Sequence, residues 1–527
     1  MRLRVLAILA AMAVALLPPL ALAQKQGGVL RVQHRDSPGS MSIHEEGTIS
    51  TVLPAMGVFN NLVLYDQHKP QNSMATIVPE LATSWTWNKE YTALTFKLRE
   101  GVTWHDGKPF TSADVKCTWE MLNGTAKEKF KVNNRSGWYF NLESISVNGP
   151  YEATMHLKRP QPAFVALLAS GFTPVYPCHV SPRDMRVKPI GTGPFKFVEF
   201  KANESMKVER NPNYWKPGLP YLDGIEYTII TNRSTAMLSF VAGKFDMTFP
   251  YEVTVQLMKD VKTQYPEAVC EIDSDNVAAN ILMNPVPPFD NLALRKAVIM
   301  AVDRQAFIDI LFEGKGDMGG AMMPLPDGAW GLPPDQLKDL PGFSPDIAKS
   351  REAAREIMRG LGYGPDKHLT VRLSTRNLPQ YRDPSTILLS QLKEIWIDGE
   401  LDPIETAIWV PKLIRREYQM ALSLVGNGVD DPDQQFYENY VCGSRTYMGY
   451  CDKTIDALVD KQSAEPDQAK RRQIVWEIDR KLQQDVVRPM IYYIRGGTCH
   501  RPEVKGITMM VNSIFNGWRM EDVWLDR

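Results

Sequence analysis

The sequence of 527 residues lacks an excess of charge of either sign, since 60 Lys and Arg residues oppose 61 Asp and Glu residues. A neutral balance gives no attraction for nucleic acid or for an anionic membrane surface, so neither is expected as a partner. Low-complexity tracts and internal repeats are also missing, which excludes collagen-like, disordered and solenoid proteins. The remaining class, at 44% hydrophobic and 23% charged residues, is a large globular protein of several domains.

The sequence also lacks a complete catalytic or metal-binding motif. The eight histidines lie far apart, and no H-E-x-x-H, G-x-S-x-G or G-x-x-x-x-G-K-[ST] pattern occurs. Gly314–Gly319 fits G-x-G-x-x-G but follows a predicted helix, whereas a dinucleotide site follows a strand. Ser390–Lys393 fits S-x-x-K and Ser274–Asn276 fits S-D-N, but in reversed order and without K-T-G. We therefore expect no catalysis, no cofactor and no metal.

One acidic run, Asp430–Asp433, leaves a choice open. Carboxylates gathered in this way can bind a metal ion or act in acid–base chemistry. The run also stands directly before a predicted helix at 434–438. A capped, solvated turn at the start of that helix is the interpretation favoured here.

The N-terminus has the pattern of a secretory signal peptide. Arg2 and Arg4 precede an apolar run from Val5 to Leu20, and Ala21–Ala23 offers the small residues that signal peptidase accepts. Pro18 and Pro19, within that run, argue against a membrane anchor. Cysteine is absent at the cleavage site, so no lipid anchor is expected. The sequence predicts cleavage after Ala23 and export to the periplasm.

Export makes the six cysteines candidates for disulfide bonds. Cys442 and Cys451 bracket a turn-rich segment and are predicted to form a local bridge, with two free thiols as the alternative. The other four cysteines are Cys117, Cys178, Cys270 and Cys499. They can form two more bridges, but their spacing in the sequence does not give the pairing. None has the C-x-x-C spacing of a zinc or redox site.

Strand and helix patterns alternate along the chain, which is typical of an α/β fold. A capping box at Thr111–Asp114 predicts a helix through Leu122, and apolar residues at helical spacing predict one long helix over 294–311. Further helices are predicted at 347–361, 385–395, 409–416, 453–463 and 468–484. Strands are predicted between them, at 370–374, 421–425 and 490–494.

Seven segments, in order, resemble the solute-binding proteins of ABC importers, specifically the oligopeptide, dipeptide and nickel type known as family 5. The segments are Pro79–Trp85, Phe96–Val115, Gly191–Phe195, Arg210–Trp215, Gly243–Met247, Arg295–Arg304 and Val504–Gly506. One such string would be weak, but seven in the family order are strong, and the match extends over nearly all of the chain after the signal peptide. The hairpin segment 96–115 is expected to brace a lobe rather than to bind a ligand.

The resemblance implies a two-lobed periplasmic binding protein fold of type II (cluster C), with two crossover strands and an extra subdomain inserted in the first lobe. We expect lobe I at 24–65, 190–275 and 490–527, the inserted subdomain at 66–189 and lobe II at 276–489. The crossovers are expected near 270–281 and 490–499. Because crossover strands run side by side, a bridge between Cys270 and Cys499 becomes a hypothesis.

The resemblance also places candidate ligand contacts. Glu46 stands where peptide-binding relatives have a first-lobe contact, and Trp409 occupies a matching aromatic position. Arg376 and Asn377 follow a predicted strand, and an Arg there could hold a carboxylate through two hydrogen bonds. The alternative for Glu46, Trp409 and Arg376 is that they are rim or packing residues.

One segment departs from the family pattern. Peptide-binding members place an aspartate that pairs with the peptide α-ammonium at the position of Gly428, and glycine supplies no charge. Asn427 and Asp430 flank this position; Asp430 or Asp431 is the candidate substitute, although one of them is expected to cap the following turn. A smaller, non-peptide solute is the alternative to a peptide.

These observations predict a periplasmic protein that captures a peptide or another small organic solute between its lobes and presents it to a permease–ATPase complex at the inner membrane. The protein is expected to act as a monomer. Two alternatives remain open at this point: a secreted hydrolase of peptides or β-lactams, and a sensor or chaperone module on the same fold.

Overall fold

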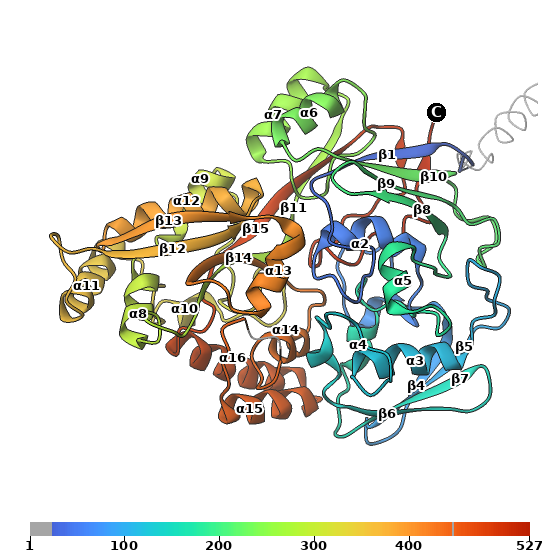
Figure 1. Ribbon diagram of the computed structural model, residues 1–527, viewed down its shortest axis with the longest axis horizontal. Helices are drawn as coiled ribbons and strands as arrows, with labels where there is room; N and C mark the ends of the chain where they lie inside the picture. Colours follow the sequence, from blue (N-terminus) through green and yellow to red (C-terminus); the bar gives the residue numbers. More distant parts are fainter. Residues whose placement is uncertain (1–23, 445–446) are drawn as a thin grey trace, which may run out of the picture.

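The computed structural model describes residues 24–444 and 447–527 and has two α/β lobes (Figure 1). The predicted signal peptide and its cleavage site, residues 1–23, lie outside the described residues. Within the described ranges, no helix is long and apolar enough to span a bilayer. The residue limits of the lobes and of the inserted subdomain remain predictions. The strand order of each sheet is given by the structure.

The sheet of lobe I has four strands in the order β1-β10-β9-β8. The first pair, β1 (Val29–His34) and β10 (Gly224–Ile229), is parallel, and β8 (Phe195–Lys201) and β9 (Ser205–Arg210) complete the sheet in antiparallel fashion. Short pairs lie beside it: β2 (Val63–Tyr65) with β3 (Ile77–Pro79), and β16 (Val504–Lys505) with β17 (Trp524–Leu525). The helices of this part are α2 (Ile49–Ala55), α5 (Pro182–Val187), α6 (Arg233–Val241) and α7 (Val255–Gln264).

The inserted subdomain has an antiparallel sheet in the order β4-β5-β7-β6. Its strands are β4 (Ala82–Trp87), β5 (Ala93–Leu98), β6 (Leu142–Val147) and β7 (Glu152–Leu157). Helix α3 (Ser112–Leu122) packs on this sheet and begins with the predicted capping box, in which Thr111 N–H donates to Asp114 (2.9 Å). The remaining helical segments are η3 (Ser136–Tyr139) and α4 (Phe164–Leu168).

The sheet of lobe II has five strands in the order β13-β12-β14-β11-β15. They are β11 (Val269–Met283), β12 (Leu369–Arg376), β13 (Ile397–Ile404), β14 (Met420–Gly426) and β15 (Met490–His500). Strands β13, β12 and β14 are mutually parallel, and β11 runs antiparallel to both of its neighbours. The helices are α8 (Leu292–Met300), α9 (Arg304–Phe312), α10 (Pro334–Leu337), α11 (Ile347–Gly360), α12 (Pro379–Lys393), α13 (Thr406–Ile414), α14 (Pro432–Asn439), α15 (Lys453–Ala464) and α16 (Gln468–Gln484).

Strands β11 and β15 connect the lobes, side by side and antiparallel. In their register Cys270 lies opposite Cys499, and the two are joined by a disulfide bond. The structure also pairs Cys442 with Cys451, the local bridge expected from the sequence, and Cys117 with Cys178. The Cys270–Cys499 bridge therefore fastens the two connecting strands to each other.

Removing this bridge by Cys270→Ser with Cys499→Ser is expected to lower the free energy of unfolding by about 2–4 kcal/mol. The reason is that the bridge closes a loop of 229 residues, whose freedom is restored in the unfolded chain. The matched control, Cys442→Ser with Cys451→Ser, opens a loop of only 9 residues and should cost less. Chemical denaturation measures both; an equal or smaller loss for the long loop would contradict the expectation.

Two sequence predictions are wrong. The single helix expected over 294–311 is divided into α8 and α9, because the Asp303 carboxylate accepts a hydrogen bond from the Ala306 N–H (3.1 Å) and starts a new helix. The acidic turn before α14 is capped by Asp431, as expected, but it is not solvated. Asp431 and Asp433 are both buried and both pair with Arg471 of α16, at 2.7 and 3.1 Å.

Candidate functional site

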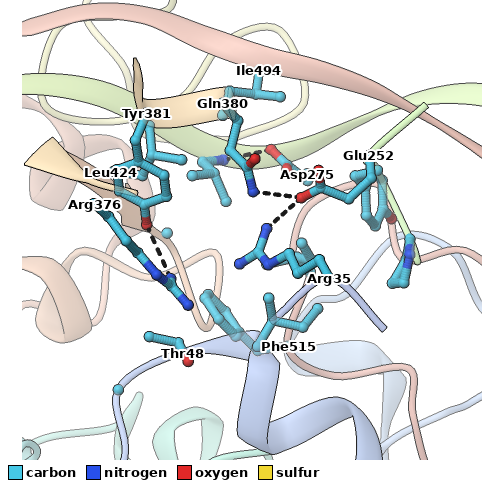
Figure 2. A pocket seen from close by; sticks show the side chains of 17 residues that line it. Arg35, Thr48, Glu252, Asp275, Arg376, Gln380, Tyr381, Leu424, Ile494 and Phe515 are labelled. Carbon is cyan, nitrogen blue, oxygen red and sulfur yellow. Dashed lines mark hydrogen bonds and ion pairs between the residues drawn. The ribbon is translucent and has the colours of Figure 1, made fainter. Parts of the chain in front are cut away.

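Three adjoining cavities lie between the lobes. The central one has a volume of about 90 Å³ and each neighbour about 70 Å³. Thr48 and Phe515 border both the central cavity and one outer cavity. Glu252 and Gln380 border both the central cavity and the other outer cavity. Because neighbouring cavities share these lining residues, the three form one cleft. The walls thus come from lobe I, lobe II, the connecting strands and the C-terminal segment (Figure 2).

A buried ion pair crosses the cleft. Arg376, at the end of β12 in lobe II, pairs with Asp36, which follows β1 in lobe I, and both side chains are almost fully buried. The Asp36 carboxylate also accepts hydrogen bonds from Ser50 and Thr406, each at 2.6 Å. Thr406 in turn accepts one from Arg376 Nε (2.9 Å). Two residues from each lobe therefore form one closed hydrogen-bond network.

The opposite charges of Asp36 and Arg376 shift the pKa of each group so that both stay ionised. Burial by itself would raise the pKa of Asp36, but Arg376 and Arg35 outweigh it and hold that pKa well below its usual range. Burial likewise opposes the charge on Arg376, and Asp36 raises the Arg376 pKa above its ordinary value. Both members of the pair are therefore ionised at neutral pH.

A second polar contact between the lobes is centred on Glu252. Its Oε1 accepts hydrogen bonds from Arg35 in lobe I and from Gln380 of α12 in lobe II, both at 2.5 Å (Figure 2). The Arg35 guanidinium also stacks on Phe249, 4.7 Å from the ring centre. The carboxylate is thus held between the two walls of the cleft.

Aromatic rings form the opposite end of the cleft. Phe515 packs on Phe172 of the inserted subdomain with ring centres 4.6 Å apart, and Tyr381 meets Trp409 edge to face at 6.3 Å. The Arg135 guanidinium lies 4.1 Å from the Phe172 ring centre. Flat apolar walls of this kind bury solutes of varied shape without requiring hydrogen bonds.

The inserted subdomain also touches lobe II directly. The indole N–H of Trp138 donates to Glu438 of α14 (2.8 Å), and the Gln161 amide donates to Asp433 of the same helix (2.8 Å). Because these bonds join residues of different lobes, the described arrangement is a closed one.

Of the four ligand contacts predicted before β14, two line the cleft, one lies next to it and one lies outside it. Arg376 and Trp409 line the cleft. Glu46 lies next to the cleft, because Gly47, the residue after it, borders the central cavity. The Glu46 carboxylate accepts a hydrogen bond from Ser40 (2.9 Å), and burial raises the pKa of Glu46. Asn377 is exposed outside the cleft and donates to Glu405 (2.8 Å).

The predicted contacts after β14 lie behind the cleft wall. Gly428 is buried; its N–H donates to Gln434 (2.8 Å), and its carbonyl accepts from Asn516 (2.9 Å). Asn427 is buried as well, and its N–H donates to the backbone of Asn276 (3.2 Å). The Asp430 carboxylate accepts the backbone N–H of Ala329 (3.2 Å), and burial raises its pKa to about 7.

Sequence reasoning missed several residues that line the central cavity. Arg35 matched no motif. Asp275 was considered only as the centre of the S-D-N match that was set aside, although it falls within the segment predicted as the first crossover. The strand carries three acidic residues, Glu271, Asp273 and Asp275, and no local pattern distinguishes the one that borders the cleft. Phe515 lies in a C-terminal segment without periodic pattern, so nothing in the sequence indicates that it reaches the cleft.

Comparison with known proteins agrees with this geometry. The relative "Di/tripeptide-binding protein 1" of Pseudomonas aeruginosa strain UCBPP-PA14 is 25% identical over 460 residues, which cover 81% of this chain and 82% of that protein. The periplasmic binding protein DppA from Helicobacter pylori, solved with the peptide STSA, has a TM-score of 0.84 at 20% identity, covering 95% of this chain and 99% of that one. These likenesses are to binding proteins of the same two-lobed fold.

A second similar structure was solved with a different solute. It is AgaA from A. tumefaciens R10 in complex with agropinic acid, with a TM-score of 0.80 at 22% identity, covering 95% of this chain and 99% of that one. The family model described as "Bacterial extracellular solute-binding proteins, family 5 Middle" matches residues 76–447. The chain therefore belongs to family 5 of the bacterial extracellular solute-binding proteins.

Proposed function

We propose that this protein captures a peptide or another small organic solute in the cleft between its lobes and delivers it to the permease of an ABC importer. The observation that carries the proposal is that both lobes supply polar groups to one enclosed space, through Asp36 with Arg376 and Glu252 with Gln380. A solute that contacts both walls stabilises the closed population, which a permease can distinguish from the open one. Membership in a family of binding proteins argues against the hydrolase alternative.

The solute we favour is small. The central cavity of about 90 Å³ has room for a short molecule rather than for a long peptide in the closed arrangement. Relatives bind, by their names, di- and tripeptides in one case and agropinic acid in another. We propose that Arg376 and Trp409 lie against the solute, with Glu46 beside them, and that position 428 supplies no charged contact.

The route of the protein is part of the proposal. The signal-peptide pattern supports export with cleavage after Ala23, and the family is an extracellular one. The protein then acts in the periplasm as a monomer, and the permease–ATPase complex at the inner membrane is its partner. The ATP is hydrolysed by other subunits, while this chain supplies recognition and closure.

A thermal-shift screen of small polar solutes tests the proposal. A solute that binds only the folded state raises the melting temperature by mass action, by several degrees at a concentration about 100-fold above its Kd. The matched control is Thr48→Trp, which places an indole in the space shared by two of the cavities. Hits should stabilise the wild type and not the variant; equal stabilisation of both would place binding outside the cleft.

A further inference from the structure

Asp275 differs from the other charged residues of the central cavity in having no partner of opposite charge. Arg376 is paired with Asp36, and Arg35 with Glu252, but in residues 24–444 and 447–527 no cation lies within ion-pair distance of the Asp275 carboxylate. The residue is only 3% exposed. A buried carboxylate without a cation is unfavourable, so either a proton or a bound positive group must compensate it.

The backbone turns this side chain into the cleft. The pairing of β11 with β15 shifts register between Ser274 and Ala278, and Asn276 adopts a left-handed conformation with φ of 53°. Such a bulge interrupts the alternation of a strand and redirects a side chain. Here the carboxylate accepts a hydrogen bond from the N–H of Val277 (2.9 Å) and borders the cavity beside Glu252 and Gln380 (Figure 2).

The groups around Asp275 are mainly hydrogen-bond acceptors. Gln380 donates its amide N–H to Glu252, and its Oε1 is buried without a donor among the described residues. Arg35 is held by Glu252, and Arg233, in the adjoining cavity, lies 3.6 Å from Glu252 and 3.9 Å from Asp383. With these ion pairs assigned, Asp275 is the carboxyl group of the central cavity that has no cationic partner among the described residues.

We propose that Asp275 binds a protonated nitrogen of the solute, with Gln380 Oε1 and Glu252 as further acceptors. An ammonium group has three N–H donors and no acceptor, so it complements this set of oxygens, and its charge compensates the buried carboxylate. This inference rests on the proposed function. It places the ammonium site on the strand that connects the lobes rather than at Gly428, where the family resemblance implies an aspartate.

Two matched pairs of probes test the proposal by isothermal titration at millimolar concentration. Ala-Ala is compared with N-acetyl-Ala-Ala, and diaminobutane with butanediol, because each pair differs in its ammonium groups. The ammonium member of at least one pair should bind ten-fold or more tightly than its neutral counterpart. In Asp275→Asn its affinity should fall about 10- to 100-fold, as expected for a lost charge-assisted hydrogen bond.

The matched control is Asp273→Asn, which neutralises a carboxylate on the same strand outside the central cavity and should leave the affinity unchanged. Three results would each overturn the inference. Neutral probes could bind as well as ammonium probes, Asp275→Asn could keep the affinity of the wild type, or no ammonium probe could bind. Neutral solutes that bind the wild type but not Thr48→Trp would leave the proposed function standing. The wild-type comparison of probes remains decisive even if Asp275→Asn folds poorly.

The pH dependence of binding gives a second readout. Burial raises the pKa of Asp275 in the empty cleft to about 8, so the carboxyl must lose a proton before it can pair with a cation. Affinity for an ammonium probe should therefore rise with pH, about ten-fold between pH 6 and 7, and stay flat in Asp275→Asn. The charged or titratable groups near Asp275 are Arg35, Glu252, Tyr251, Tyr492 and Arg495.

Discussion

Arg376→Met is expected to weaken solute binding about 100-fold or more. In the closed arrangement the substitution leaves the Asp36 carboxylate buried without its cation, which costs about 3–5 kcal/mol for a pair of this kind. In an open arrangement water reaches Asp36, so the cost falls mainly on the closed state. Titration calorimetry with a solute found by the thermal-shift screen measures the affinity, and solution scattering measures the closed fraction.

Two further variants separate the possible reasons for that loss. Arg372→Met removes an exposed arginine from the same strand and should change neither quantity. Asp36→Asn combined with Arg376→Met removes both charges and should recover most of the closure. Recovery of closure without recovery of affinity would show that Arg376 also contacts the solute. Unchanged affinity and closure in Arg376→Met alone would contradict the role given to the ion pair.

Arg519→Met is expected to lower the free energy of unfolding by about 3–5 kcal/mol. Arg519 lies in the C-terminal segment, is fully buried and pairs with buried Glu80 at 2.8 Å, next to the first strand of the inserted subdomain. It also donates to Asn61 Oδ1 (3.2 Å). Removing the cation leaves Glu80 as an uncompensated buried charge, which is among the largest effects that a single substitution produces.

The matched control for this prediction is Arg415→Met, which breaks an ion pair with Glu417 at the exposed surface and should have no measurable effect. Chemical denaturation and melting temperature measure both variants. An Arg519→Met protein as stable as Arg415→Met would show that the C-terminal segment is not part of the buried framework of lobe I.

Local signals in the sequence predicted the regular elements well. The capping box at Thr111 starts α3 where expected, and α16 spans the predicted residues because its apolar positions, such as Ile474 and Ile478, recur on one buried face. The division of α8 from α9 at Asp303 was missed because apolar spacing continues across the break. There a single capping carboxylate outweighs the periodic pattern.

The candidate site was less accessible to sequence reasoning, because its contacts join residues that are hundreds of positions apart. Arg376 was singled out as a ligand contact, but its partner Asp36 lies 340 residues away and gave no signal. Arg471 similarly neutralises Asp431 from 40 residues away. Because of this ion pair, the acidic turn before α14 is buried, although it was expected to be solvated. Pairing of this kind depends on how the lobes meet, and no local pattern encodes it.

Native mass spectrometry of protein purified gently from the periplasm tests the central claim most directly. If the cleft captures a solute, the wild type should carry a small organic adduct, and Thr48→Trp, in which an indole occupies the cleft, should lack it. An adduct bearing an ammonium group would in addition agree with the role inferred for Asp275. The same adduct at equal occupancy in both proteins would contradict binding between the lobes.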